Sequence, residues 1–175
     1  SSSNKVDTSP TTICPDSSFD LVEAIRQAAK ELTGTKYSQA KKTDCSGMFH
    51  KVLDSFRDEC PEMILPTIKE ARSSRNIAKW YYDHGNLKII KNPKESGHLI
   101  KPGMVMFYGY GSQANKLNRK KLDINTMITR GIGTNHVAIV TSVEMKDGVV
   151  ESYEIFHGRN PKRPAGITTS RRIYP

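Results

Sequence analysis

The 175-residue chain lacks the features that define several large classes of protein. No stretch approaches the roughly 18 apolar residues that a membrane-spanning helix requires, and no basic start with an apolar centre indicates a signal peptide. No internal repeat is evident. Three cysteines without C-x-x-C spacing suggest neither a zinc site nor a dense disulfide framework. We therefore expect a soluble chain with the length of one ordinary domain.

Residues 1–17 differ in composition from the remainder of the chain. They are rich in Ser, Thr, Asp and Pro, which is typical of a flexible tail or linker. Because the chain also begins without methionine, we expect that an N-terminal signal or anchor was removed and that the protein is exported. We predict one domain over 18–175. In an oxidising compartment, Cys14 and Cys60 could pair and leave Cys45 free.

Basic residues outnumber acidic residues by 27 to 18, which gives a formal net charge of +9. This charge implies an anionic partner, although a solvated basic surface without a partner explains it equally well. Nucleic acid, anionic lipid and acidic wall polymers all satisfy the charge. No aromatic-glycine ribonucleoprotein signature accompanies it, so we expect no specific nucleic-acid partner. The basic clusters are Lys41-Lys42, Arg119-Lys120-Lys121, Lys162-Arg163 and Arg171-Arg172.

The spacing of apolar residues changes from helical to strand-like along the chain. Helical spacing predicts a helix over 18–33 with Ser17 and Asp20 as a capping box, and two more, one starting close to Cys45 and one around 73–85. We expect 111–134 to be a long loop with one helical turn at most, which could form a flap near a site. Strands are predicted over 103–110, 136–145, 149–158 and 166–174, with a hairpin turn at Asp147-Gly148.

This order of elements predicts an α+β fold in which N-terminal helices pack on a central antiparallel sheet. In the hairpin, residues whose numbers sum to about 295 should face one another, which would bring His157 close to His136.

Cys45 lies in the sequence TDCSG, at the predicted start of a helix. The free N–H groups and the dipole of a helix start stabilise a thiolate there, and Ser46 and Gly47 would let a carbonyl approach the backbone. A cysteine in this position is nevertheless more often structural than reactive. Position alone therefore leaves both interpretations open.

A cysteine nucleophile needs a base, and five histidines are available. His50 would point away from Cys45 on the same helix and face outward, while His84 and His98 fall in turns. His136 opens the apolar strand HVAIVTSV, where its side chain could face a cleft or simply solvent. The orienting third residue of a triad could then be His157 or Asn160.

Several segments together resemble the NlpC-type papain-like cell-wall cysteine peptidases. They are TDCSG, GTKY before it, ARSS after it, IKPGMVMFYG, NHVAIV and AGITTSRRIYP, in the order that the family has. The spacing differs from typical members: His136 follows Cys45 after a longer interval, and the two histidines are farther apart. The specific part of the resemblance is the pair formed by TDCSG and NHVAIV.

The resemblance implies Cys45 as nucleophile, His136 as general base and His157 as the orienting residue. It implies that Tyr37 lines the site near the oxyanion, although core packing would also explain Tyr37. Asp44 and Ser46 match positions that shape the site and bind the substrate, and Asp44 could equally be a helix cap. No metal and no organic cofactor is implied.

The implied activity is cleavage of an amide in the peptidoglycan peptide stem, as an endopeptidase or as an N-acetylmuramoyl-L-alanine amidase. The implied partner is the peptide stem. Anionic wall polymers, through the basic surface, and an inhibitor or immunity protein could also bind, and we expect a monomer. Two other classes stay open. One is a Cys-His acyltransferase acting on lipid, which would need an apolar groove, and the other is a basic nucleic-acid-binding module.

Overall fold

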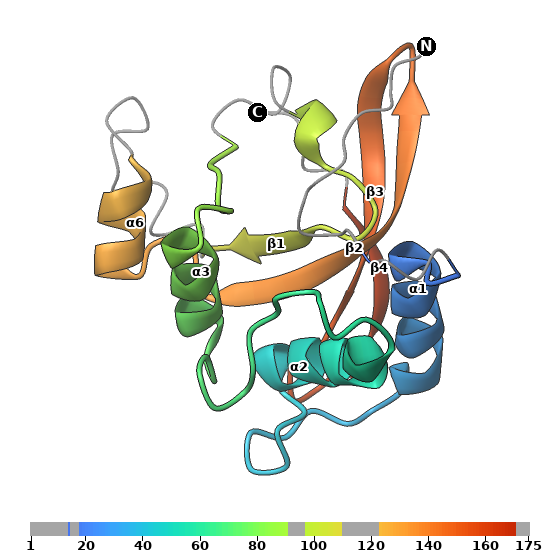
Figure 1. Ribbon diagram of the computed structural model, residues 1–175, viewed down its shortest axis with the longest axis vertical. Coiled ribbons are helices and arrows are strands. Elements are labelled where there is room, and N and C mark those ends of the chain that lie inside the picture. Colours follow the sequence, from blue (N-terminus) through green and yellow to red (C-terminus); the bar gives the residue numbers. More distant parts are fainter. Residues whose placement is uncertain (1–13, 15–17, 91–96, 110–122, 171–175) are drawn as a thin grey trace.

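A computed structural model describes residues 14, 18–90, 97–109 and 123–170 of the chain. Within these residues four α-helices accompany a four-stranded antiparallel sheet of order β1-β2-β3-β4, which confirms the α+β class (Figure 1). The helices are α1 Leu21–Leu32, α2 Cys45–Phe56, α3 Ser74–Asp83 and α6 Ile124–Arg130, with short 3₁₀ helices η3 Arg57–Glu59 and η4 Gly97–Leu99. The strands are β1 Val105–Tyr108, β2 His136–Lys146, β3 Val149–His157 and β4 Gly166–Ser170.

Each of the first three helices begins at a polar capping residue. The side chains of Asp20, Asp44 and Ser73 accept hydrogen bonds from backbone N–H groups in the first turns of α1, α2 and α3. Helix α1 therefore starts later than the prediction over 18–33. The predicted capping partner Ser17 lies outside the described residues.

The β2–β3 hairpin has the predicted turn and register. Asp147 and Gly148 both have positive φ, as a tight hairpin turn requires, and Ile139 lies opposite Phe156. Two irregularities shift the register between Val140 and Lys146. The hairpin is the longest pair of strands and extends beyond the helices (Figure 1).

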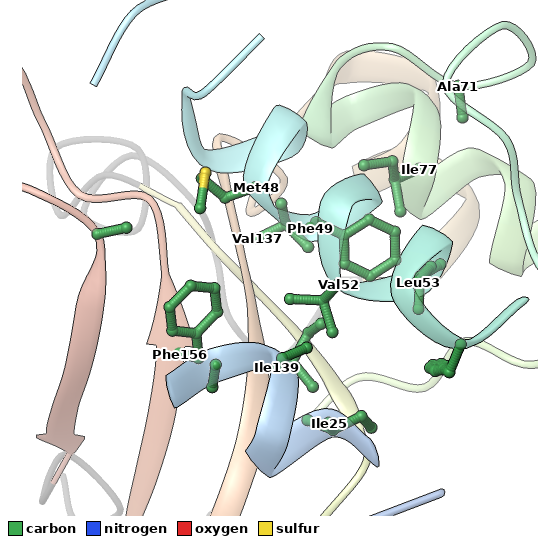
Figure 2. Packing of buried hydrophobic residues seen from close by; sticks show 14 residues of the cluster. Ile25, Met48, Phe49, Val52, Leu53, Ala71, Ile77, Val137, Ile139 and Phe156 are labelled. Carbon is green, nitrogen blue, oxygen red and sulfur yellow. The ribbon is translucent and has the colours of Figure 1, made fainter. Parts of the chain in front are cut away.

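The core lies between the sheet and helices α1 and α2 (Figure 2). Side chains from alternate positions of β2 and β3 point to this face, so the strands follow the two-residue period. Ala138, Val140 and Ile155 point to the other face of the sheet, where Ile100 covers them. The labelled core residues are Ile25, Met48, Phe49, Val52, Leu53, Ala71, Ile77, Val137, Ile139 and Phe156.

Two expectations are wrong. His50 does not face outward, because it is only 1% exposed and its Nε2 lies 2.6 Å from the carbonyl oxygen of Ala71. Its face of α2 is covered by the segment that leads into α3. The expected loop over 111–134 contains helix α6, which is longer than one turn, while residues 110–122 lie outside the described part.

Cys14 and Cys60 form a disulfide, and Cys45 is free. The bond attaches the end of the N-terminal segment to the chain just after η3. None of the helices in the described ranges is long and apolar enough to cross a membrane.

Candidate active site

Cys45 is the first residue of α2 and is half-buried. Asp44 precedes it as the helix cap, and the Asp44 carboxylate accepts a hydrogen bond of 3.0 Å from the Gly47 N–H. The cysteine thus lies where the N–H groups of a helix start are directed outward. Its sulfur lies 3.3 Å from the hydroxyl oxygen of Ser74, the first residue of α3.

Arg72 connects the residues on both sides of Cys45. Its guanidinium donates to Ser46 Oγ at 2.7 Å and to Asp44 Oδ1 at 3.1 Å, and it also reaches the Gln39 carbonyl oxygen at 3.3 Å. Asp44 is buried, at 8% exposed, whereas the Arg72 side chain is 36% exposed, so water screens part of the ion pair between them. The expected site residues Asp44 and Ser46 therefore have a structural role in holding the start of α2.

The two histidines expected at the site are in direct contact. His136 Nε2 lies 2.7 Å from His157 Nδ1, and His157 Nε2 lies 2.9 Å from Thr168 Oγ1 on β4. In one of the two arrangements that satisfy both contacts, the Nε2–H of each ring donates and Nδ1 of His136 is unprotonated. Neighbouring strands β2, β3 and β4 thus place two imidazole rings and a hydroxyl in one row.

Both rings favour their neutral forms. Burial lowers the pKa of His136 below its ordinary value. Burial lowers the pKa of His157 to about 4, and the neighbouring charges of His136 and Arg159 act in the same direction. His136 is therefore an unprotonated base at neutral pH.

Gly158 brings the cysteine and the histidines together. It follows His157, and a Cβ atom placed on it would lie 2.7 Å from the carbonyl oxygen of Asp44, so no side chain fits there. The end of β3 therefore lies directly against the start of α2. No hydrogen bond joins the Cys45 sulfur to His136, both of them described residues, and the sulfur contacts Ser74 instead.

The structure separates the two candidates for the orienting position. The side chain of Asn160 is exposed and accepts a hydrogen bond from the Lys162 N–H, whereas His157 contacts His136. Tyr37 is half-buried in the connection between α1 and α2. The ring of Tyr108 lies 6.3 Å from that of His136, and burial raises the pKa of its phenol.

A large, mostly apolar groove lies next to this site. Its volume is about 1390 Å³, and residues of α1, α3, α6 and the segment from η4 to β1 line it. Two of the lining residues, Tyr108 and Thr134, lie near His136. Cys45, His136 and His157 are not among its described lining residues. The groove is thus adjacent to the candidate site and does not contain it.

Sequence reasoning did not place three residues at the site, namely Arg72, Ser74 and Thr168. Arg72 and Ser74 belong to the ARSS segment, whose order relative to TDCSG was the available signal. Thr168 lies opposite Ile155 on the last strand, and nothing in its local sequence distinguishes it.

One group among the described residues has the spacing of metal ligands, namely Cys14, Cys60 and Glu62. Its two cysteines are joined in the disulfide and offer no thiolate to an ion. The chain matches no family model, and neither a curated protein nor a solved structure matches it at a significant level.

Proposed function

We propose that the chain is a papain-like cysteine hydrolase of the NlpC type that cleaves an amide bond in the peptide stem of peptidoglycan. The observation that carries the proposal is the approach of the His136–His157–Thr168 row to the helix start that bears Cys45. A thiol at a helix N-terminus beside a neutral, oriented histidine is the arrangement that acyl transfer through a thioester requires.

The reaction begins with transfer of the Cys45 proton to Nδ1 of His136. The thiolate attacks the amide carbonyl, and the Cys45 N–H donates to the developing oxyanion. His136 then gives its proton to the leaving amine, and water, deprotonated by the same ring, hydrolyses the thioester. When the Nε2–H of His136 donates to His157, Nδ1 of His136 is free to accept the thiol proton.

The substrate side of the proposal rests on the resemblance and on the charge of the chain. The net charge of +9 suits an anionic wall, and the Cys14–Cys60 disulfide, which leaves Cys45 as the free thiol, suits an exported enzyme. Both an endopeptidase and an N-acetylmuramoyl-L-alanine amidase use this chemistry.

The test is incubation of the purified protein with peptidoglycan fragments, followed by mass analysis of the products. Wild type should release stem-peptide products, and Cys45→Ala and His136→Ala should release none. Asn160→Ala is the matched control, because this side chain bonds only locally and should leave the rate unchanged. Full cleavage by Cys45→Ala would exclude the mechanism.

The apolar groove favours a second candidate, a Cys-His acyltransferase that takes its acyl group from lipid. The same thioester would then be resolved by an acceptor amine or hydroxyl instead of water. Incubation with phospholipid vesicles and mass analysis of the protein would reveal an acyl adduct on Cys45. The absence of an adduct, together with cleavage of peptidoglycan, would eliminate this candidate.

A further inference from the structure

We infer that Ser74 is a further functional residue of this site, whose hydroxyl holds the Cys45 sulfur in place and donates a hydrogen bond to the thiolate. The two atoms are 3.3 Å apart, within reach of a hydrogen bond to sulfur. The inference rests on the proposed role of Cys45 as the nucleophile.

The Ser74 hydroxyl has no other structural task in the part of the chain that is described. The neighbouring Ser73 caps α3 by accepting from the Asn76 N–H at 3.1 Å, so the cap does not need Ser74. Ser74 is 6% exposed, and a buried hydroxyl requires a hydrogen-bond partner. Among the described residues, that partner is the Cys45 sulfur.

The segment that carries Ser74 is fixed to α2 at two further points. The Ala71 carbonyl lies 2.6 Å from the buried His50 ring, and Arg72 bonds to Ser46 and Asp44. These contacts precede Ser74 directly in the chain, so they restrict where its oxygen can lie. The Ser74–Cys45 contact therefore lies at the end of a segment whose position is fixed by other hydrogen bonds to α2.

A hydroxyl can serve both states of the cysteine. It accepts from the S–H group of the resting thiol, and after rotation it donates its O–H to the sulfur. When the thiol proton has moved to Nδ1 of His136, the bond from Ser74 becomes charge-assisted and therefore stronger. The hydroxyl thus stabilises the ionised nucleophile before it attacks, while its own proton stays on oxygen.

Alkylation of Cys45 by iodoacetamide tests this role without any substrate. Cys14 and Cys60 are in a disulfide, so the alkylation rate of the folded protein measures the reactivity of Cys45. We expect Ser74→Ala to slow alkylation about fivefold at neutral pH, the factor for one lost hydrogen bond. The difference should disappear at alkaline pH, where the thiol is fully ionised in both proteins.

Two variants control for structural effects. Ser74→Thr keeps a hydroxyl and should react at close to the wild-type rate. Ser55→Ala removes a hydroxyl near the end of α2, the helix that starts at Cys45, where it bonds to the Val52 carbonyl, and should leave the rate unchanged. Thermal melts establish that each variant is folded, and if Ser74→Ala does not fold, the Ser74→Thr rate decides.

Equal alkylation of wild type and folded Ser74→Ala at every pH, or slow alkylation of folded Ser74→Thr, would overturn the inference. Failure of the proposed function gives a different pattern. In that case wild type leaves peptidoglycan intact while alkylation still depends on Ser74.

Discussion

Replacement of Gly158 by alanine would separate the two parts of the candidate site. The new Cβ atom would lie 2.7 Å from the Asp44 carbonyl oxygen and 2.9 Å from Met48 Cγ, whereas ordinary contacts begin at 3.4 Å. The Asp44 oxygen also accepts the Met48 N–H bond at 2.8 Å, so it cannot withdraw without disturbing the start of α2. Strand β3 must then move by about 0.7 Å.

That displacement acts directly on His157 and, through it, on His136. A shift approaching 1 Å at a catalytic group costs on the order of 100-fold in rate. We therefore expect Gly158→Ala to lower kcat/KM for stem-peptide release by roughly 10- to 100-fold. Overpacking should also lower the free energy of unfolding by about 1–3 kcal/mol.

The assay compares kcat/KM and thermal melting for wild type, Gly158→Ala and Gly166→Ala. Gly166 is the matched control, because a Cβ atom there would meet no atom within 4 Å. A folded Gly158→Ala with wild-type kcat/KM would refute the reasoning that this close approach aligns the site.

Three further predictions concern stability and the support of Asp44. The pKa of His157 is about 4 in the folded protein, so on acidification the unfolded chain takes up a proton at this residue before the folded protein does. The free energy of unfolding should therefore fall by on the order of 2 kcal/mol between about pH 6.5 and 4. Denaturant titrations should show a smaller loss for His157→Gln, and an equal loss would contradict this origin. Cys60→Ser should lower the free energy of unfolding by about 4 kcal/mol, because the bond to Cys14 closes a loop of 46 residues. Dithiothreitol should not lower the stability of Cys60→Ser further. A melting temperature of Cys60→Ser equal to that of wild type would contradict the expected stabilisation by the disulfide. Arg72→Lys, which cannot bond to Ser46 and Asp44 through two guanidinium nitrogens at once, should lower kcat/KM about tenfold with little change in KM. A change in KM alone would contradict a positioning role.

Local sequence predicted the elements on which the site is built. Cys45 follows a capping Asp44, and the apolar spacing from Met48 to Phe56 predicted the helix that begins there. The Asp147-Gly148 turn set the hairpin register closely enough to bring His136 and His157 together. These features depend on neighbours in the chain or on one short turn.

The remainder of the site depends on contacts between distant residues. Arg72 reaches Ser46, and Ser74 reaches Cys45, only because α3 packs beside the start of α2. His50 was expected outside for the same reason, because its helix position does not reveal that Ala71 covers it. Such contacts follow from tertiary packing, which a single sequence does not display.

Mass analysis of peptidoglycan fragments after exposure to wild type and to Cys45→Ala decides whether Cys45 cleaves the peptide stem. We expect a new amine and a new carboxyl end at one amide of the peptide stem with wild type, and intact fragments with Cys45→Ala. Intact fragments with wild type, or the same products with Cys45→Ala, would contradict this expectation.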